Sequence, residues 1–137
     1  MHEGNMHHIK TTVLTLTLAL SGITAAQAAP TLPPSLQGVW ATDTATCTRK
    51  VSNMSEGDFR LTLKGNRITM EGWAFKRVEK IYDVHQSTPS KFVYDSEYSE
   101  QWDKTRSDGV EDASVLSLRN GILTVGEAGL RVKKCRQ

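Results

Sequence analysis

The chain has 137 residues, of which 38% are hydrophobic and 23% are charged. This length suits a single domain, and 17 basic against 15 acidic residues leave a net charge of +2, too small to indicate a nucleic-acid-binding protein. Three of the four histidines lie within the first eight residues, so only His85 is left for metal or hydrolytic chemistry in the rest of the chain.

The N-terminus has the pattern of a cleaved signal peptide. Lys10 precedes an uncharged run, 11–23, and small residues follow as far as Ala26-Gln27-Ala28. This order of a positive residue, a short apolar run and an A-x-A site predicts a leader over 1–28. The run is shorter than the roughly 20 residues that cross a bilayer, so we expect a periplasmic or secreted product without a transmembrane segment. The alternative is an amphipathic helix of the folded domain. Residues 6–10 form a more usual start of a leader than residues 1–5, which favours translation from Met6.

The predicted mature chain opens with an extended linker, 29–35, that contains three prolines, and continues as one domain over 36–137. Cys47 and Cys135 both lie in this domain. Because an exported protein meets an oxidising compartment, the pair predicts one disulfide that closes nearly the whole domain into a loop. Such a loop closure contributes about 4 kcal/mol to stability. Two free, buried thiols are the alternative.

Two hairpins can be read with their register. Alternating apolar residues flank a two-residue loop, Gly65-Asn66, and a second loop, Asn120-Gly121, whose sequence favours the type I′ turn. With two-residue loops, residues at equal distance from the loop face each other. The turns therefore predict two cross-strand pairs, Leu63 with Ile68 and Leu118 with Leu123.

Other alternating segments complete an all-β pattern. Gly72 is expected to form a β-bulge, because the alternation changes phase after it. Strands are predicted over 36–41, 76–84, 91–103 and 130–133, with connections over 43–56, 85–90 and 104–114. About eight strands at this spacing predict a single small antiparallel meander, closed as a barrel or folded as a sandwich.

The first strand carries Gly38-Val39-Trp40, which resembles the G-x-W pattern of lipocalin-type barrels. The resemblance implies that Trp40 closes one end of a barrel and stacks on a cation of the last strand, Arg131 or Lys133. The layout also resembles small exported bacterial proteins with an early cysteine and a second one in the C-terminal strand, with which no established activity is associated. The alternative is that Trp40 is an ordinary core residue.

Glu100 is the most unusual residue of the predicted strands. Regular alternation would turn it inward with Tyr98 and Trp102, where a carboxylate could orient a ligand or act as a general acid. We favour the alternative that the strand ends or bulges at Ser99 and leaves Glu100 in water. Independently of Glu100, the large inward rings favour a filled barrel over a ligand cavity; they are Trp40, Phe59, Phe75, Phe92, Tyr94, Tyr98 and Trp102.

Charge is unevenly distributed along the chain. Residues 95–112 contain seven acidic and two basic side chains, a net charge of −5, whereas residues 60–80 sum to +4. The acidic segment could engage a basic partner through Glu97, Asp103 and Glu111. The alternative is that the two segments simply solvate their outer faces.

These observations predict an exported, non-enzymatic binding module without metal or cofactor. The expected partner is a basic envelope protein or a small amphipathic ligand, the latter bound by Tyr98, Glu100 and Trp102. A second hypothesis is an envelope inhibitor of a basic hydrolase, such as a lysozyme, that acts through the acidic hairpin formed by residues 95–112. An enzyme that uses Glu100 with a nearby aspartate is a third. Asp83, His85 and Ser87 lie two apart on one strand, which is not an arrangement that lets a catalytic triad converge.

Overall fold

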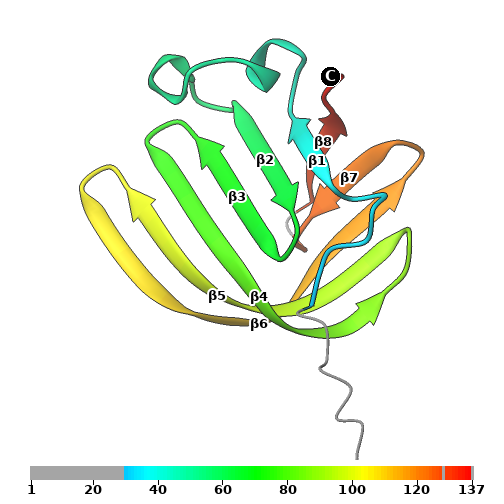
Figure 1. Cartoon of the computed structure of the whole chain (residues 1–137). Helices are drawn as coiled ribbons and strands as arrows, with labels where there is room; N and C mark the ends of the chain where they lie inside the picture. Colours follow the sequence, from blue (N-terminus) through cyan, green and yellow to red (C-terminus); the bar gives the residue numbers. More distant parts are fainter. Residues whose placement is uncertain (1–29, 128, 137) are drawn as a thin grey trace, which may run out of the picture.

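The computed structural model describes residues 30–127 and 129–136, and these form a closed eight-stranded barrel in which each strand pairs with the next and β1 with β8. Figure 1 shows β4, β5 and β6 as long curved strands that sweep beneath the shorter ones. The strands are β1 (Gly38–Ala41), β2 (Phe59–Lys64), β3 (Arg67–Gly72), β4 (Phe75–Ser87), β5 (Lys91–Trp102), β6 (Thr105–Arg119), β7 (Ile122–Val125) and β8 (Leu130–Lys134). Two 3-10 turns, η1 (Ala45–Cys47) and η2 (Val51–Asn53), lie between β1 and β2.

The predicted registers of both hairpins are confirmed. Leu63 pairs with Ile68 across β2 and β3, and Leu118 pairs with Leu123 across β6 and β7. The glycine that ends the second turn has φ +74°, and the asparagine before it has φ 52°, as a type I′ turn requires. Turn length and hydrophobic alternation thus set the same register independently at two places in the barrel.

Two local predictions are wrong. Gly72 does not form a bulge: it ends β3 and pairs with Phe75, across a two-residue turn in which Ala74 takes φ 55°. The segment 104–114 is not a loop: Asp103, at φ 50°, and Lys104 form another tight turn, and residues 105–114 are the first part of β6. A glycine is needed at position 109 of this strand, because a Cβ there would lie 2.7 Å from the hydroxyl of Tyr98.

The segment before β1 is part of the barrel rather than a linker. Leu32 and Leu36 are fully buried in the core, and the amide of Leu32 donates a hydrogen bond of 2.8 Å to the carbonyl of Gly65 in the β2–β3 turn. Both leucine side chains belong to the apolar core, at the end of the barrel where the β2–β3 turn lies. The burial of these apolar side chains therefore stabilises the proline-rich segment against the barrel.

Trp40 is buried in the core, and its indole nitrogen donates a hydrogen bond of 2.9 Å to the carbonyl of Leu36. The cation near its ring is Lys134, whose Nζ lies 5.7 Å from the ring centroid, and not Arg131 or Lys133. The register explains the difference, because Trp40 pairs with Lys134 and directly opposed residues share a face. Arg131 alternates with the buried Val132 and is exposed.

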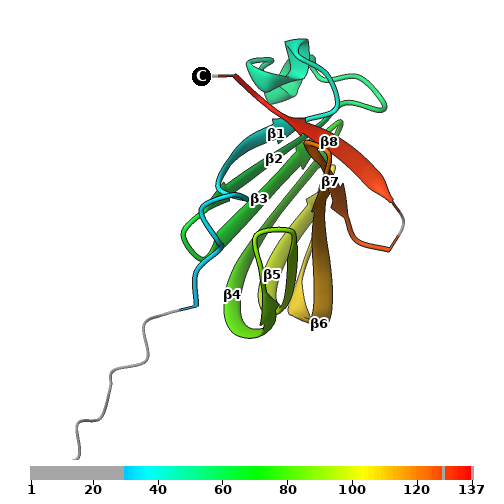
Figure 2. The same ribbon diagram turned by 90° about the vertical axis from the view of Figure 1, so that its right-hand side faces the viewer.

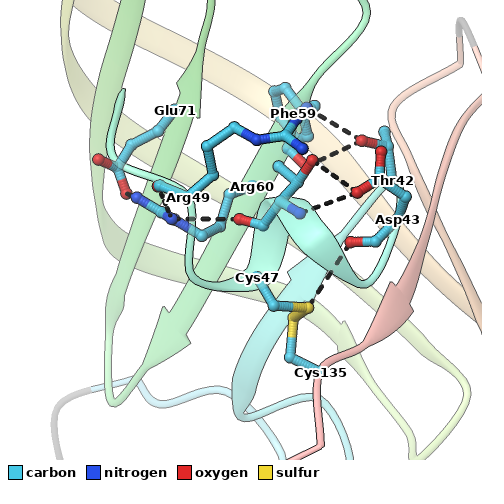
Figure 3. The surroundings of a disulfide bond; sticks show 9 residues. Thr42, Asp43, Cys47, Arg49, Phe59, Arg60, Glu71 and Cys135 are labelled. Carbon is cyan, nitrogen blue, oxygen red and sulfur yellow. Dashed lines mark hydrogen bonds and ion pairs between the residues drawn. A yellow bond between two sulfur atoms is a disulfide. The ribbon is translucent and has the colours of Figure 1, made fainter. Parts of the chain in front are cut away.

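One disulfide, Cys47–Cys135, joins η1 to the residue after β8 across a sequence separation of 88. Figure 2 shows the 3-10 turns and the C-terminal strand together at one end of the barrel. There β1 and β8 share only two residue pairs, so the disulfide reinforces the shortest seam of the barrel. Arg60 holds the same loop by donating to the carbonyls of Thr46 and Arg49 and pairing with Glu71 (Figure 3).

The predicted leader, 1–28, lies outside the described residues. Within the described ranges, no helix has the length and apolar character needed to cross a membrane.

We expect the disulfide to contribute about 4 kcal/mol, since it closes a loop that spans most of the domain. Replacing Cys47 and Cys135 together by alanine should lower the melting temperature by roughly 15–30 °C in thermal unfolding followed by circular dichroism. A reductant should lower the wild-type melting temperature similarly and leave that of the double variant unchanged. A double variant that melts within a few degrees of the wild type would contradict this role.

Candidate functional site

The barrel is filled at one end and hollow at the other. The hollow end, opposite the buried Leu32, contains an open cavity of about 580 Å³, within the range of small-molecule sites. Its apolar wall comes from the start of β2, the end of β3, the start of β4 and the β7–β8 hairpin, and includes Phe59, Met70, Phe75, Val125 and Leu130. The aromatic side chains therefore do not fill the interior as predicted.

The polar wall of this cavity is built by alternation along β4. Phe75, Arg77 and Glu79 share the inner face with the buried Ile81, so two charged side chains point into the barrel. The register places Glu100 of β5 directly opposite Arg77. Neighbouring strands thus bring one guanidinium and several carboxylates to the same wall.

Arg77 is the centre of an ion-pair cluster. Its Nε and one Nη donate to a single oxygen of Glu79 at 3.1 and 3.0 Å, and the other Nη donates to Glu100 at 2.7 Å. A further hydrogen bond reaches Glu111 of β6. The guanidinium carbon also lies 4.0 Å from the centroid of the Tyr98 ring, a cation–π contact. Three carboxylates and one aromatic ring of the protein therefore contact the Arg77 side chain.

Glu79 is almost completely buried, with 1% of its surface exposed. Burial raises the pKa of its carboxyl group, although hydrogen bonds from Tyr94 and Arg77 act in the opposite direction. The hydroxyl group of Tyr94 donates a hydrogen bond of 2.8 Å to the second oxygen of Glu79. Burial and the nearby charge of Glu79 raise the pKa of Tyr94 in turn, which keeps the phenol protonated as the donor.

The three predicted ligand-binding residues do not all line the cavity. Glu100 and Trp102 line it, whereas Tyr98 lies beneath Arg77 and over Gly109. The favoured expectation that the strand ends at Ser99 is wrong, because β5 stays regular as far as Trp102 and turns Glu100 inward.

Trp102 forms the rim of the cavity. Its ring packs against Phe75 with the centroids 4.5 Å apart, and its indole nitrogen donates to Glu100. Even so, 56% of the residue is exposed. A large aromatic face held in place but half in water is available to an incoming molecule.

The three predicted partner-binding residues do not share one surface. Glu97 is exposed and alternates with the inward Tyr98, so it lies on the outer face. Asp103 is exposed in the β5–β6 turn, and Glu111 lines the cavity and pairs with Arg77. The negative charge of 95–112 is thus divided between the outside of the barrel and its hollow end.

His85 lies on β4 beside Asp83 and Asp95, and ligand atoms of the three residues lie within 4.8 Å of one another. His85 Nε2 pairs with Asp95 at 2.8 Å, and Asp95 also accepts the amide of Ala113. The hydrogen bond and charge of Asp95 raise the pKa of His85. This cluster ties together the irregular parts of β4, β5 and β6, and none of its members lines the cavity.

Sequence reasoning missed Arg77 and Glu79. It predicted a strand over 76–84, and did not extend the inward alternation from Phe75 along this strand. The signal was present, because Phe75 and Ile81 share their alternation with both charged residues. Comparison of the chain with protein-family models, with curated proteins and with solved structures gives no match.

We expect Arg77→Met to lower the free energy of unfolding by about 3–5 kcal/mol at neutral pH, because it leaves the buried Glu79 without its cation. The loss should shrink towards about pH 4, since the folded-state pKa of Glu79 is raised and the carboxyl group then takes up a proton. Replacing both Arg77 and Glu79 by methionine should recover most of the lost stability.

Urea unfolding at the two pH values measures these effects, with Arg131→Met on the exposed outer face as the control. Equal losses in the Arg77 and Arg131 variants would mean that the ion-pair cluster does not hold the inner wall.

Proposed function

We propose that the protein is an exported, non-enzymatic binding module that takes a small amphipathic molecule into the hollow end of its barrel. The observation that carries the proposal is the cavity of about 580 Å³, which has an apolar wall on one side and charged groups on the other. Sites for small molecules typically combine such apolar lining with a few fixed polar groups.

Two features support a binding role over catalysis. The charged groups of the polar wall bond to one another through Arg77, which gives a fixed recognition surface. His85, the natural candidate for a general base, lies outside the cavity lining. The periplasm or the extracellular space is the proposed location, supported by the signal-peptide pattern and by the disulfide. Inhibition of a basic hydrolase through the acidic hairpin stays a prediction.

Trp102 should contribute directly to binding, since its half-exposed ring forms the rim of the cavity. The uncharged fluorescent probe N-phenyl-1-naphthylamine should bind in a 1:1 ratio, and Trp102→Ala should weaken its binding by about tenfold. The matched control is Trp73→Ala, because Trp73 is 59% exposed against 56% for Trp102 but does not line the cavity.

Fluorescence titration of the wild type and of the Trp102→Ala and Trp73→Ala variants with the probe tests this proposal. The proposal requires saturable binding to the wild type and to the Trp73 variant with similar affinity. Absence of saturable binding, or an equal loss in both variants, would show that the hollow end is not a ligand site.

A further inference from the structure

We infer that the ligand of the cavity is an organic cation: an ammonium or related positive group attached to a flat apolar body. This inference rests on the proposed function and specifies its ligand. It follows from the charge of the lining, from the engagement of Arg77 and from the position of the aromatic rings.

Among the described residues, the lining contains one guanidinium, that of Arg77, and four glutamates: Glu79, Glu100, Glu111 and Glu127. Asp112 also lines the cavity, but its carboxylate accepts a hydrogen bond from the exposed Tyr82. One cation balances only part of this charge, so the potential inside the hollow end is negative. A positive ligand would be attracted by this potential, and a negative one repelled.

Arg77 is the cation of the lining that an anionic ligand would have to use, and four of its five N–H donors are already engaged. It bonds to Glu79, Glu100 and Glu111, and its planar face lies against Tyr98. An anion would have to compete with these charge-assisted hydrogen bonds and would weaken the pairing of the buried Glu79. Arg77 therefore anchors the carboxylates and does not act as the receptor for an anion.

The carboxylates lie where a bound cation could reach them. Glu111 has half of its side chain exposed although it pairs with Arg77. Glu100 is held between Arg77 and the indole nitrogen of Trp102. A flat apolar body stacked on the exposed face of Trp102 would thus bring its positive group next to Glu100 and Glu111, with the ring itself adding a cation–π attraction.

Three naphthalene probes of nearly equal size and different charge test the inference by isothermal titration calorimetry: 1-naphthylmethylammonium, 1-naphthalenemethanol and 1-naphthoate. The ammonium should bind at least about tenfold more tightly than the alcohol, and the carboxylate should bind most weakly. The preference for the ammonium should decrease at high salt, because the site is open to solvent and its charges are partly screened.

Glu111→Gln should reduce the preference for the ammonium about threefold or more and leave binding of the alcohol unchanged. The amide keeps an oxygen to accept from Arg77, so the variant tests charge with little change in shape. Glu97→Gln, on the outer face of the neighbouring strand, is the matched control and should leave the preference unchanged.

The outcomes separate the two proposals. If none of the three probes binds, the proposed function fails. If the alcohol or the naphthoate binds as tightly as the ammonium, the cavity is a ligand site but the inference about charge is overturned. Equal effects of the Glu97 and Glu111 variants would also overturn it, because the preference would then come from the overall charge of the protein.

Discussion

The burial of Glu79 is the constraint on which the hollow end of the barrel depends. A carboxylate removed from water is costly unless a cation and hydrogen-bond donors compensate it. Arg77 and Tyr94 provide both, and the position of Arg77 is fixed in turn by Glu100, Glu111 and the ring of Tyr98. Charged groups arranged in this way cannot pack as hydrocarbons do. The same interaction that stabilises the inner wall therefore keeps this end of the barrel open.

The two ends of the barrel follow different rules. At the filled end, Leu32 and Leu36 from the segment before β1 pack with Trp40, Leu61 and Leu63 in one buried apolar core. At the hollow end, β6 pairs with β7 only from Leu116 to Arg119, so the first part of β6 diverges from the short last strands. The long β4–β5–β6 sheet then supplies the polar wall of the cavity. A small domain can carry such a polar cavity because the other end and one disulfide stabilise the fold.

The sequence predicted the parts of this fold that local chemistry determines. Both hairpin registers followed from turn length and alternation, and the disulfide followed from an even cysteine pair behind a signal-peptide pattern. What failed depends on contacts between distant strands. Lys134 rather than Arg131 approaches Trp40 because the β1–β8 register decides which residues share a face. Arg77 and Glu79 point inward because partners on β5 and β6 compensate their charge, and a single strand shows no such partner.

The most direct test of this account is an X-ray structure of the protein with 1-naphthylmethylammonium bound. The account predicts the naphthalene ring against Trp102 and the ammonium beside Glu100 and Glu111, with Arg77 still bonded to Glu79 over the Tyr98 ring. A probe found outside the hollow end, or one whose ammonium turns to solvent while Arg77 leaves Glu79, would contradict it.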